Sequence, residues 1–122
     1  MTGTTNSSTI MQKTLNFEIL STLKEVMEDD FIELIPAFFE SSDQILTEFK
    51  DALSNKDFEI MQRNVHSLKS SSANLGAMNL SSMAQDLEQQ CKNKIVVSLS
   101  QLEAIENEYT CVKQALLDFS AE

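Results

Sequence analysis

The fold of this 122-residue chain is indicated most clearly by residues 57–76, which read D-F-E-I-M-Q-R-N-V-H-S-L-K-S-S-S-A-N-L-G. One stripe of side chains recurs there at intervals of three and four residues, at Phe58, Met61, Val65, Leu68, Ser72 and Leu75. This spacing predicts an amphipathic helix that buries one face. Asp57 is suited to cap the first turn, and Gly76 is suited to end the helix, because glycine readily adopts the left-handed backbone that closes helices.

Two helices are predicted before this stretch. The first ends at the acidic residues 28–30 and carries an apolar stripe of Phe17, Leu20, Leu23 and Met27. Either Asp29 or Asp30 is expected to cap the second helix, which covers about residues 30–53. The stripe of the second helix comprises Phe31, Leu34, Ile35, Phe38, Ile45, Phe49 and Leu53. Pro36 lies inside this helix and is expected to bend it or to loosen its first turns.

Two further helices are predicted after the central stretch. A shorter helix begins near residues 79–80, ends at Asn93 and Lys94, and buries Leu80, Met83, Ala84, Leu87 and Cys91. Ser98 and Gln101 have the spacing of a capping box, which predicts the start of a last helix. Alternating intervals of three and four residues in that helix separate Leu102, Ile105, Tyr109, Val112, Leu116 and Phe119.

The pattern as a whole favours one all-α domain. Because long helices joined by short connections pack antiparallel, we expect an up-and-down antiparallel four-helix bundle with an additional short N-terminal helix, in residues 13–122. Residues 1–12 are polar, rich in Ser and Thr, and aperiodic, so we expect them to form a flexible tail. The chain has only two glycines and one proline, which agrees with long helices rather than short strands.

The formal net charge of -10 narrows the range of partners. The nine basic residues are scattered and do not form the cationic cluster that nucleic acids require. The negative charge weakens attachment to an anionic membrane, and no apolar run approaches the roughly 18 residues that span one. Because the N-terminus lacks a secretory signal, we expect a cytoplasmic protein. Because of its negative charge and the lack of a long apolar run, we expect it to bind neither nucleic acid nor membrane. Cys91 and Cys111 fall on apolar helical positions and are expected to be small core residues rather than a disulfide.

His66, the single histidine of the chain, is the strongest candidate for chemistry. At about 100° per residue it lies roughly 130° from the centre of its helix's stripe and faces outward. Its flank is shared by Gln62, Lys69, Ser70 and Ala73. Imidazole is nucleophilic and largely neutral near pH 7. A lysine one turn away can balance the charge of an attached phosphoryl group, which is about two negative charges. An inert surface histidine and a solvated lysine are the alternatives for His66 and Lys69.

The run from His66 to Ala77, H-S-L-K-S-S-S-A-N-L-G-A, resembles the signature of histidine phosphotransfer (HPt) domains. In that signature a lysine stands three residues after the histidine, and a glycine stands ten residues after it. Residues 80–88 are similar to the family's following helix, and residues 29–35 resemble the usual entry to its long helix. The resemblance covers nearly everything from about Leu15 to Phe119.

The resemblance implies a phosphocarrier of a His-Asp two-component phosphorelay. His66 would take a phosphoryl group on Nε2 from the aspartate of a receiver domain, and Lys69 would stabilise the phosphorylated form. The partners would be receiver domains of a hybrid sensor histidine kinase and of a response regulator. They would dock on a monomer, against a surface whose candidate residues are Gln62, Arg63, Ser70, Ala73, Asn74 and Gln85.

The sequence also argues against an enzyme that phosphorylates itself. It has no glycine-rich phosphate loop and no set of carboxylates arranged for magnesium. We therefore expect a carrier with neither kinase nor ATPase activity and with no metal or other cofactor of its own. The Mg²⁺ ion that phosphoryl transfer needs would come from the partner receiver domain.

Two positions affect how closely the family's site would be reproduced. Ser70 stands where the family commonly has glycine, so it adds bulk beside the ring and a hydroxyl that can hydrogen-bond a phosphoryl group. Glu88 matches a position where some members place glutamine against the imidazole. A glutamate there can orient the ring by accepting the Nδ1 proton, although it also repels a phosphoryl group. A plain solvent-facing glutamate is the alternative.

Two other classes of function stay open at this stage. One is an acidic interaction module that only sequesters a receiver, and transfer of label from a phosphorylated receiver would distinguish it from a carrier. The other is an enzyme. A di-iron bundle needs Glu-x-x-His pairs, whereas Arg63 stands three residues before the single histidine, which argues against that metal site. Incubation of the chain with labelled ATP would test for a kinase.

Overall fold

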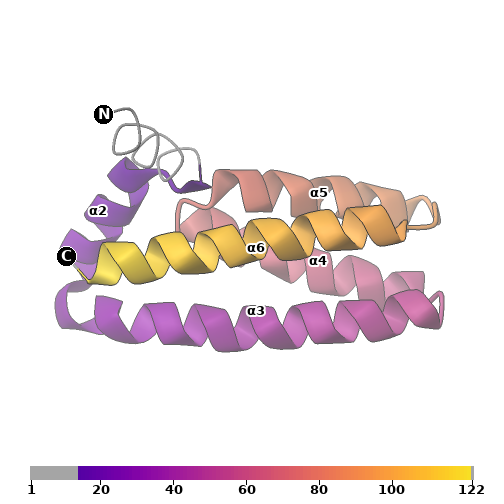
Figure 1. Cartoon of the computed structure of the whole chain (residues 1–122), viewed down its shortest axis with the longest axis horizontal. Helices are drawn as coiled ribbons and strands as arrows, with labels where there is room; N and C mark the ends of the chain where they lie inside the picture. Colours follow the sequence, from indigo (N-terminus) through magenta and orange to yellow (C-terminus); the bar gives the residue numbers. More distant parts are fainter. Residues whose placement is uncertain (1–13, 122) are drawn as a thin grey trace.

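A computed structural model describes residues 14–121, and this part of the chain folds into α-helices joined by short connections. The elements are α2 (Phe17–Met27), the 3₁₀ turn η1 (Glu28–Asp30), α3 (Phe31–Ser54), α4 (Phe58–Asn74), α5 (Met78–Lys92) and α6 (Leu99–Ser120). Helices α3 to α6 lie lengthwise beside one another, and α2 lies at one end of the bundle (Figure 1). The predicted all-α four-helix bundle with an additional N-terminal helix is therefore confirmed.

The buried faces follow the predicted stripes closely, with a drift along the longest helix. In α3 the core takes Phe31, Ile35, Phe38, Ser42, Leu46, Phe49 and Ala52. The predicted residue Ile45 is only half-buried, and its neighbour Leu46 lies in the core instead. An apolar stripe on a straight helix drifts by about 20° per heptad, so the seven predicted positions could not all face inward. Eight other residues of the predicted stripes also lie at the edge of the core, half-buried, namely Phe17, Leu23, Met27, Leu34, Leu53, Phe58, Met83 and Phe119.

Side-chain caps begin three of the helices. The Asp57 carboxylate accepts a hydrogen bond from the backbone N–H of Ile60 at 3.2 Å, which confirms the predicted cap of α4. Ser98 and Gln101 form the predicted capping box at the start of α6. Asn16 caps α2 by accepting from the backbone N–H of Ile19 at 3.1 Å. Each of these caps satisfies N–H groups that would otherwise have no partner within the helix.

The predicted aspartate cap of α3 is wrong. Neither Asp29 nor Asp30 makes a capping side-chain hydrogen bond to the start of this helix. Both belong to the turn η1, and Asp30 has helical backbone angles, φ -70° and ψ -19°. A cap residue needs an extended backbone for its side chain to reach back to the first turn, and the helical angles of η1 remove it. Helix α3 then runs without interruption through Pro36.

Gly76 ends α4 as predicted, and it also holds α2 against the bundle. Its φ of 78° lies in the left-handed region. Its carbonyl accepts a hydrogen bond from the backbone N–H of Asn16 at 2.7 Å. A Cβ atom at this position would lie 2.8 Å from the backbone oxygen of Asn16. The turn between α4 and α5 and the start of α2 are therefore packed backbone to backbone, and only glycine fits there.

The two cysteines have different environments. Cys91 is buried in the core, as predicted, but Cys111 is exposed, and both are free thiols. Cys111 lies one residue before the buried Val112, so it falls outside the stripe that α6 turns inward, and its predicted place in the core is wrong. The predicted flexible tail, residues 1–12, lies outside the described residues. Among the helices that are described, none is long and apolar enough to cross a membrane.

Candidate functional site

His66 lies on the outer side of α4, with 60% of its side chain exposed. The reason is the register of the helix, because Met61, Val65 and Leu68 occupy the inner face and are fully buried. The predicted outward orientation of the imidazole is confirmed. A side chain at this point is within reach of a second protein, while its backbone is fixed in the middle of a 17-residue helix.

Glu88 comes from the neighbouring helix α5 and contacts both His66 and Lys69. Its Oε2 atom lies 2.6 Å from Nδ1 of His66, and its Oε1 atom accepts a hydrogen bond from Nζ of Lys69, also at 2.6 Å. Only 11% of the Glu88 side chain is exposed, so the solvent-facing alternative for this residue is wrong. The Lys69 side chain is 30% exposed. One carboxylate thus binds the imidazole and the ammonium group together.

The charge of Glu88 is stabilised by these contacts. The hydrogen bond from Lys69 is the largest influence and lowers the pKa of the Glu88 carboxyl group below its ordinary value. Burial acts in the opposite direction and raises the pKa, while the hydrogen bond from His66 lowers it further. The net effect is a carboxylate that stays ionised at neutral pH.

An ionised carboxylate can only accept hydrogen bonds, so the proton of a neutral His66 ring resides on Nδ1. The lone pair is then on Nε2. Among the described residues, no group hydrogen-bonds Nε2. The site therefore presents a nucleophilic nitrogen on an exposed ring, held from behind by a buried anion.

The pairing of α4 with α5 is fixed close to the site. The Ser81 hydroxyl of α5 donates a hydrogen bond to the backbone carbonyl of Lys69 at 2.8 Å. Ser81 is 8% exposed, so water competes little for this contact. This hydrogen bond and the Lys69–Glu88 pair were both absent from the sequence prediction. Their only sequence signal is the helical hairpin that turns at Gly76, which brings residues on either side of the turn opposite each other.

The residues predicted to contact a partner differ in accessibility. Arg63, Ser70, Asn74 and Gln85 are exposed, whereas Gln62 and Ala73 are half-buried. Five of the six lie on α4 within eight residues of His66, and Gln85 lies on α5 one turn before Glu88. All six therefore belong to the two helices that form the site.

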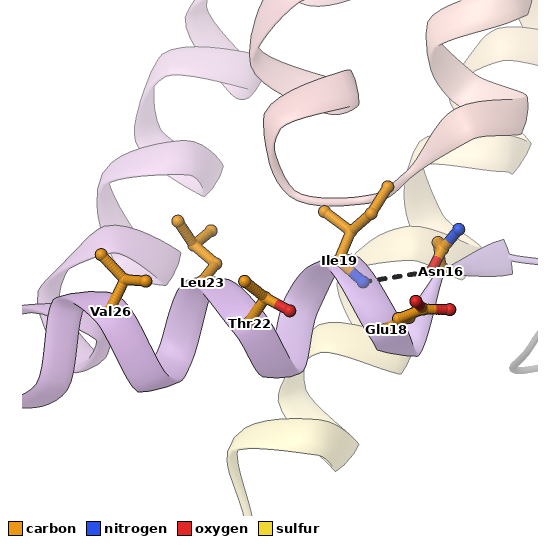
Figure 2. Close-up of a pocket in the computed structure, with 6 residues that line it drawn as sticks. All are labelled: Asn16, Glu18, Ile19, Thr22, Leu23 and Val26. Carbon is orange, nitrogen blue, oxygen red and sulfur yellow. Dashed lines mark hydrogen bonds between the residues drawn. The ribbon is translucent and has the colours of Figure 1, made fainter.

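A surface pocket of about 530 Å³ lies elsewhere, along α2. It is lined by Asn16, Glu18, Ile19, Thr22, Leu23 and Val26. Figure 2 shows these side chains following one helix, with Asn16 capping its first turn. None of them comes from α4 or α5, and the set contains no nucleophile paired with a base. Within residues 14–121, no three His, Cys, Asp or Glu side chains gather in a way that could hold a metal ion.

Comparison with known proteins identifies the class. The family model described as Hpt domain matches residues 33–115, and this chain belongs to that family. The family prediction made from the run of residues 66–77 is thereby confirmed.

A named relative is the histidine-containing phosphotransfer protein 1 of Arabidopsis thaliana, which is 29% identical over 101 residues. The match covers 80% of this chain and 66% of the relative, so the chain spans about two thirds of that protein's length.

Two solved structures have the same fold. The histidine-containing phosphotransfer protein B (HptB) from Pseudomonas aeruginosa PAO1 superposes with a TM-score of 0.83 at 26% identity, covering 89% of this chain and 96% of the other. The HPT domain of a sensor hybrid histidine kinase from Shewanella superposes with a TM-score of 0.73 at 20% identity, covering 89% and 95%. The second likeness concerns the fold alone.

Proposed function

We propose that this chain is a phosphocarrier that moves a phosphoryl group between the aspartates of receiver domains in a His-Asp phosphorelay, by way of His66. The observation that carries the proposal is the exposed imidazole whose Nδ1 is bound by the buried, ionised Glu88. This arrangement leaves Nε2 as the attacking atom. Membership of the Hpt family and the names of the relatives support the same role.

In the transfer step, the lone pair of Nε2 attacks the phosphorus of a receiver's aspartyl phosphate. An N–P bond forms, the P–O bond to the aspartyl group breaks, and the aspartate leaves as a carboxylate. The ring keeps its Nδ1 proton and becomes positively charged, and Glu88 offsets this charge across a 2.6 Å contact. The reverse sequence of bond changes delivers the phosphoryl group to the next aspartate.

Lys69 is proposed to stabilise the phosphorylated form. Its ammonium group is bound to Glu88, one helical turn from His66, so it can share its three donors between that carboxylate and a phosphoryl oxygen. The phosphoryl group brings about two negative charges next to Glu88, and the lysine reduces their repulsion. The Mg²⁺ ion of the reaction would be supplied by the receiver, because transfer depends mainly on alignment and charge neutralisation.

The proposed partners are receiver domains of a hybrid sensor histidine kinase and of a response regulator, which bind a cytoplasmic monomer. Gln62, Arg63, Ser70, Ala73, Asn74 and Gln85 are proposed to contact them. Ser70 is exposed one helical turn after His66, where its side chain adds a small volume to the surface that a receiver must approach. The contact must be weak enough to release the receiver after each transfer.

The experiment is transfer of label from ³²P-phosphorylated receiver domains to the purified chain. We expect acid-labile label on the wild type and none on His66→Gln. Glu59→Gln, at an exposed position in the first turn of α4 and outside the proposed contact residues, is the control for general effects of a substitution on that helix, and thermal unfolding checks that both variants fold. Label that persists in His66→Gln, or a folded wild type that no receiver labels, would refute the proposal.

The chain is also proposed to lack kinase activity of its own. Incubation with γ-labelled ATP and Mg²⁺ should leave it unlabelled, under conditions in which a phosphorylated receiver labels it fully. Label incorporated from ATP, and retained in a sample freed of contaminating kinases by a second purification step, would contradict this.

A further inference from the structure

The charges of this chain are strongly segregated along its sequence. Residues 60–102, which comprise most of α4, all of α5 and the turn to α6, contain four basic and only two acidic residues. The other 17 of the 19 acidic residues lie outside this segment. Helix α4, which holds His66, and its neighbour α5 are therefore depleted in carboxylates, while α2, η1, α3 and α6 hold most of them. An acidic partner surface is attracted to the first side and repelled by the second.

The α5–α6 turn continues this carboxylate-poor surface and adds exposed apolar side chains. Ile95 is 54% exposed, Val96 is 61% exposed and Leu99 is 73% exposed. Lys92 and Lys94 are exposed beside them, and neither forms an ion pair with any described residue. Figure 1 shows this turn at the end of the bundle opposite α2. We call Lys92, Lys94, Ile95 and Val96 the turn patch.

The turn patch is held rigidly. The Gln90 side chain donates a hydrogen bond to the Val96 carbonyl at 2.9 Å, and it exchanges two hydrogen bonds with the Gln101 amide at 2.9 and 2.7 Å. The backbone N–H of Ile95 bonds to the carbonyl of Gln90 at 2.8 Å. Between the exposed residues Val96 and Leu99, Val97 is buried and anchors the turn in the core. Binding to a surface that is already ordered loses little conformational entropy.

The turn patch lies within the area that a protein docked on His66 would cover. Lys92 follows Glu88 by four residues on the same side of α5, which is a displacement of roughly 6 Å along the helix axis. Ile95 and Val96 follow Lys92 by three and four residues. An interface of ordinary size covers about 800 Å² on each partner, equivalent to a disc of about 16 Å radius. A receiver centred on His66 therefore reaches the turn patch.

A second copy of this chain is a poorer occupant. Two copies joined symmetrically through the turn patch would bring Lys92 and Lys94 against their own counterparts, which is unfavourable. An acidic and apolar partner surface fits both features of the turn patch. A receiver that supplies the Mg²⁺ ion must hold it with carboxylate oxygens, so we expect negative charge on its surface near the phosphorylated aspartate.

We propose that the turn patch extends the docking surface of His66 to the α5–α6 turn, and that it binds an acidic and apolar surface beside the phospho-aspartate pocket of a receiver domain. This inference rests on the proposed function. It assigns affinity and partner choice to residues four to eight positions beyond Glu88, outside the set predicted from the sequence.

The test uses two variants and two controls matched in chemistry. Val96→Ser removes an apolar side chain from the turn patch, and Ile32→Ser does the same on α3, where Ile32 is 75% exposed. Lys92→Glu reverses a charge on the turn patch, and Lys50→Glu reverses one on α3. The partner is the receiver domain that labels His66 fastest among those tested. Transfer rates are measured over a range of receiver concentrations and at 20 to 300 mM salt, and labelling by the small donor phosphoramidate reports on His66 alone.

We expect Val96→Ser to raise the receiver concentration for half-maximal transfer about 5- to 10-fold without changing the maximal rate. Lys92→Glu should lower the transfer rate at low receiver concentration about 10-fold in low salt, with a smaller effect in high salt. Both control variants should remain within about twofold of the wild type, and phosphoramidate should label all five proteins equally.

Three outcomes would overturn the inference. If the turn-patch variants behave like their controls while transfer to the wild type proceeds, this inference alone fails. If sedimentation velocity shows a dimer of the wild type that Val96→Ser dissociates, the turn patch binds a second copy instead. If no receiver labels the wild type, the proposed function fails, and this inference fails with it.

Discussion

Removal of the Glu88 carboxylate is the sharpest test of how the site prepares His66. In Glu88→Ala, the imidazole loses the acceptor of its Nδ1 proton, and Lys69 loses its partner. His66 and Lys69 both have access to solvent, so water can replace the lost contacts and the fold should survive. What changes is the position of the ring proton. Gln89→Ala, at an exposed neighbouring position of α5, is the matched control.

The size of the effect follows from the contact. A hydrogen bond to a charged acceptor contributes about 1.5–3 kcal/mol, and the exposure of the ring places this one near the lower limit. Since about 1.4 kcal/mol corresponds to a factor of ten, the Nδ1–H form should exceed the Nε2–H form roughly tenfold in the wild type. Without Glu88 this preference for the Nδ1–H form is lost, so the fraction of the reactive form falls by at least about twofold.

A second contribution comes from the charge that develops on the ring. Formation of the N–P bond makes the imidazole positive while Nδ1 still donates to Glu88, so the carboxylate stabilises the transition state more than the ground state. A loss of about 1 kcal/mol there slows the reaction about fivefold. Together the two contributions predict phosphorylation of Glu88→Ala about tenfold slower. Glu88→Gln keeps a neutral acceptor and should lie between Glu88→Ala and the wild type.

The assay has two parts. Because the chain has one histidine, the ¹⁵N spectrum of the imidazole is unambiguous, and it reports directly which ring nitrogen is protonated. We expect a protonated Nδ1 and an unprotonated Nε2 in the wild type, and averaged signals in Glu88→Ala. The rate of labelling by phosphoramidate and by a receiver gives the kinetic effect. An unchanged spectrum together with an unchanged rate in Glu88→Ala would refute the reasoning.

Three further predictions concern stability. Gly76→Ala should lower the free energy of unfolding in urea by about 2–4 kcal/mol, because the new Cβ would lie 2.8 Å from the Asn16 oxygen at a φ of +78°, and a decrease under 1 kcal/mol would contradict this. Glu28→Gly should stabilise the fold by about 1 kcal/mol and so raise its melting temperature. The reason is that Glu28 has φ 52° and ψ -119°, a conformation that glycine adopts without strain. The stability that ionised Glu88 adds should be present above its ordinary pKa of 4.5 and be lost as the pH falls through its lower folded pKa. The difference in unfolding free energy between the wild type and Glu88→Gln should therefore disappear in acid, and a difference that grows below pH 4.5 would exclude the assigned sign.

The parts of the fold that could be predicted are those fixed by local sequence. Asp57, Ser98 and Gly76 act within one turn of chain, through a cap, a capping box and a left-handed residue, and all three do so in the structure. The outward orientation of His66 depends only on the period of one helix, so it too could be predicted.

The errors arise where a neighbouring turn or a second helix decides the outcome. The turn η1 removes the cap expected from Asp29 or Asp30, because it holds their backbone in helical angles before α3 begins. Cys111 is an exception, because the stripe predicted for α6 already contains its neighbour Val112, and adjacent residues of a helix point about 100° apart, so the error came from counting the cysteine as a core residue. Apolar composition alone does not determine which of two adjacent residues is buried.

Glu88 shows where reasoning from sequence ends at the site itself. Its distance of 22 residues from His66 did not decide between a contact and a solvent-facing side chain. The answer depends on the axial offset and the rotation of α5 against α4, which are set by the turn at Gly76, by the Ser81–Lys69 hydrogen bond and by the packing of the core. An offset of one residue, about 1.5 Å of rise and 100° of rotation, would carry the carboxylate away from the ring. The position of the proton on His66 is therefore a property of the helix pair, and no single segment of the sequence contains it.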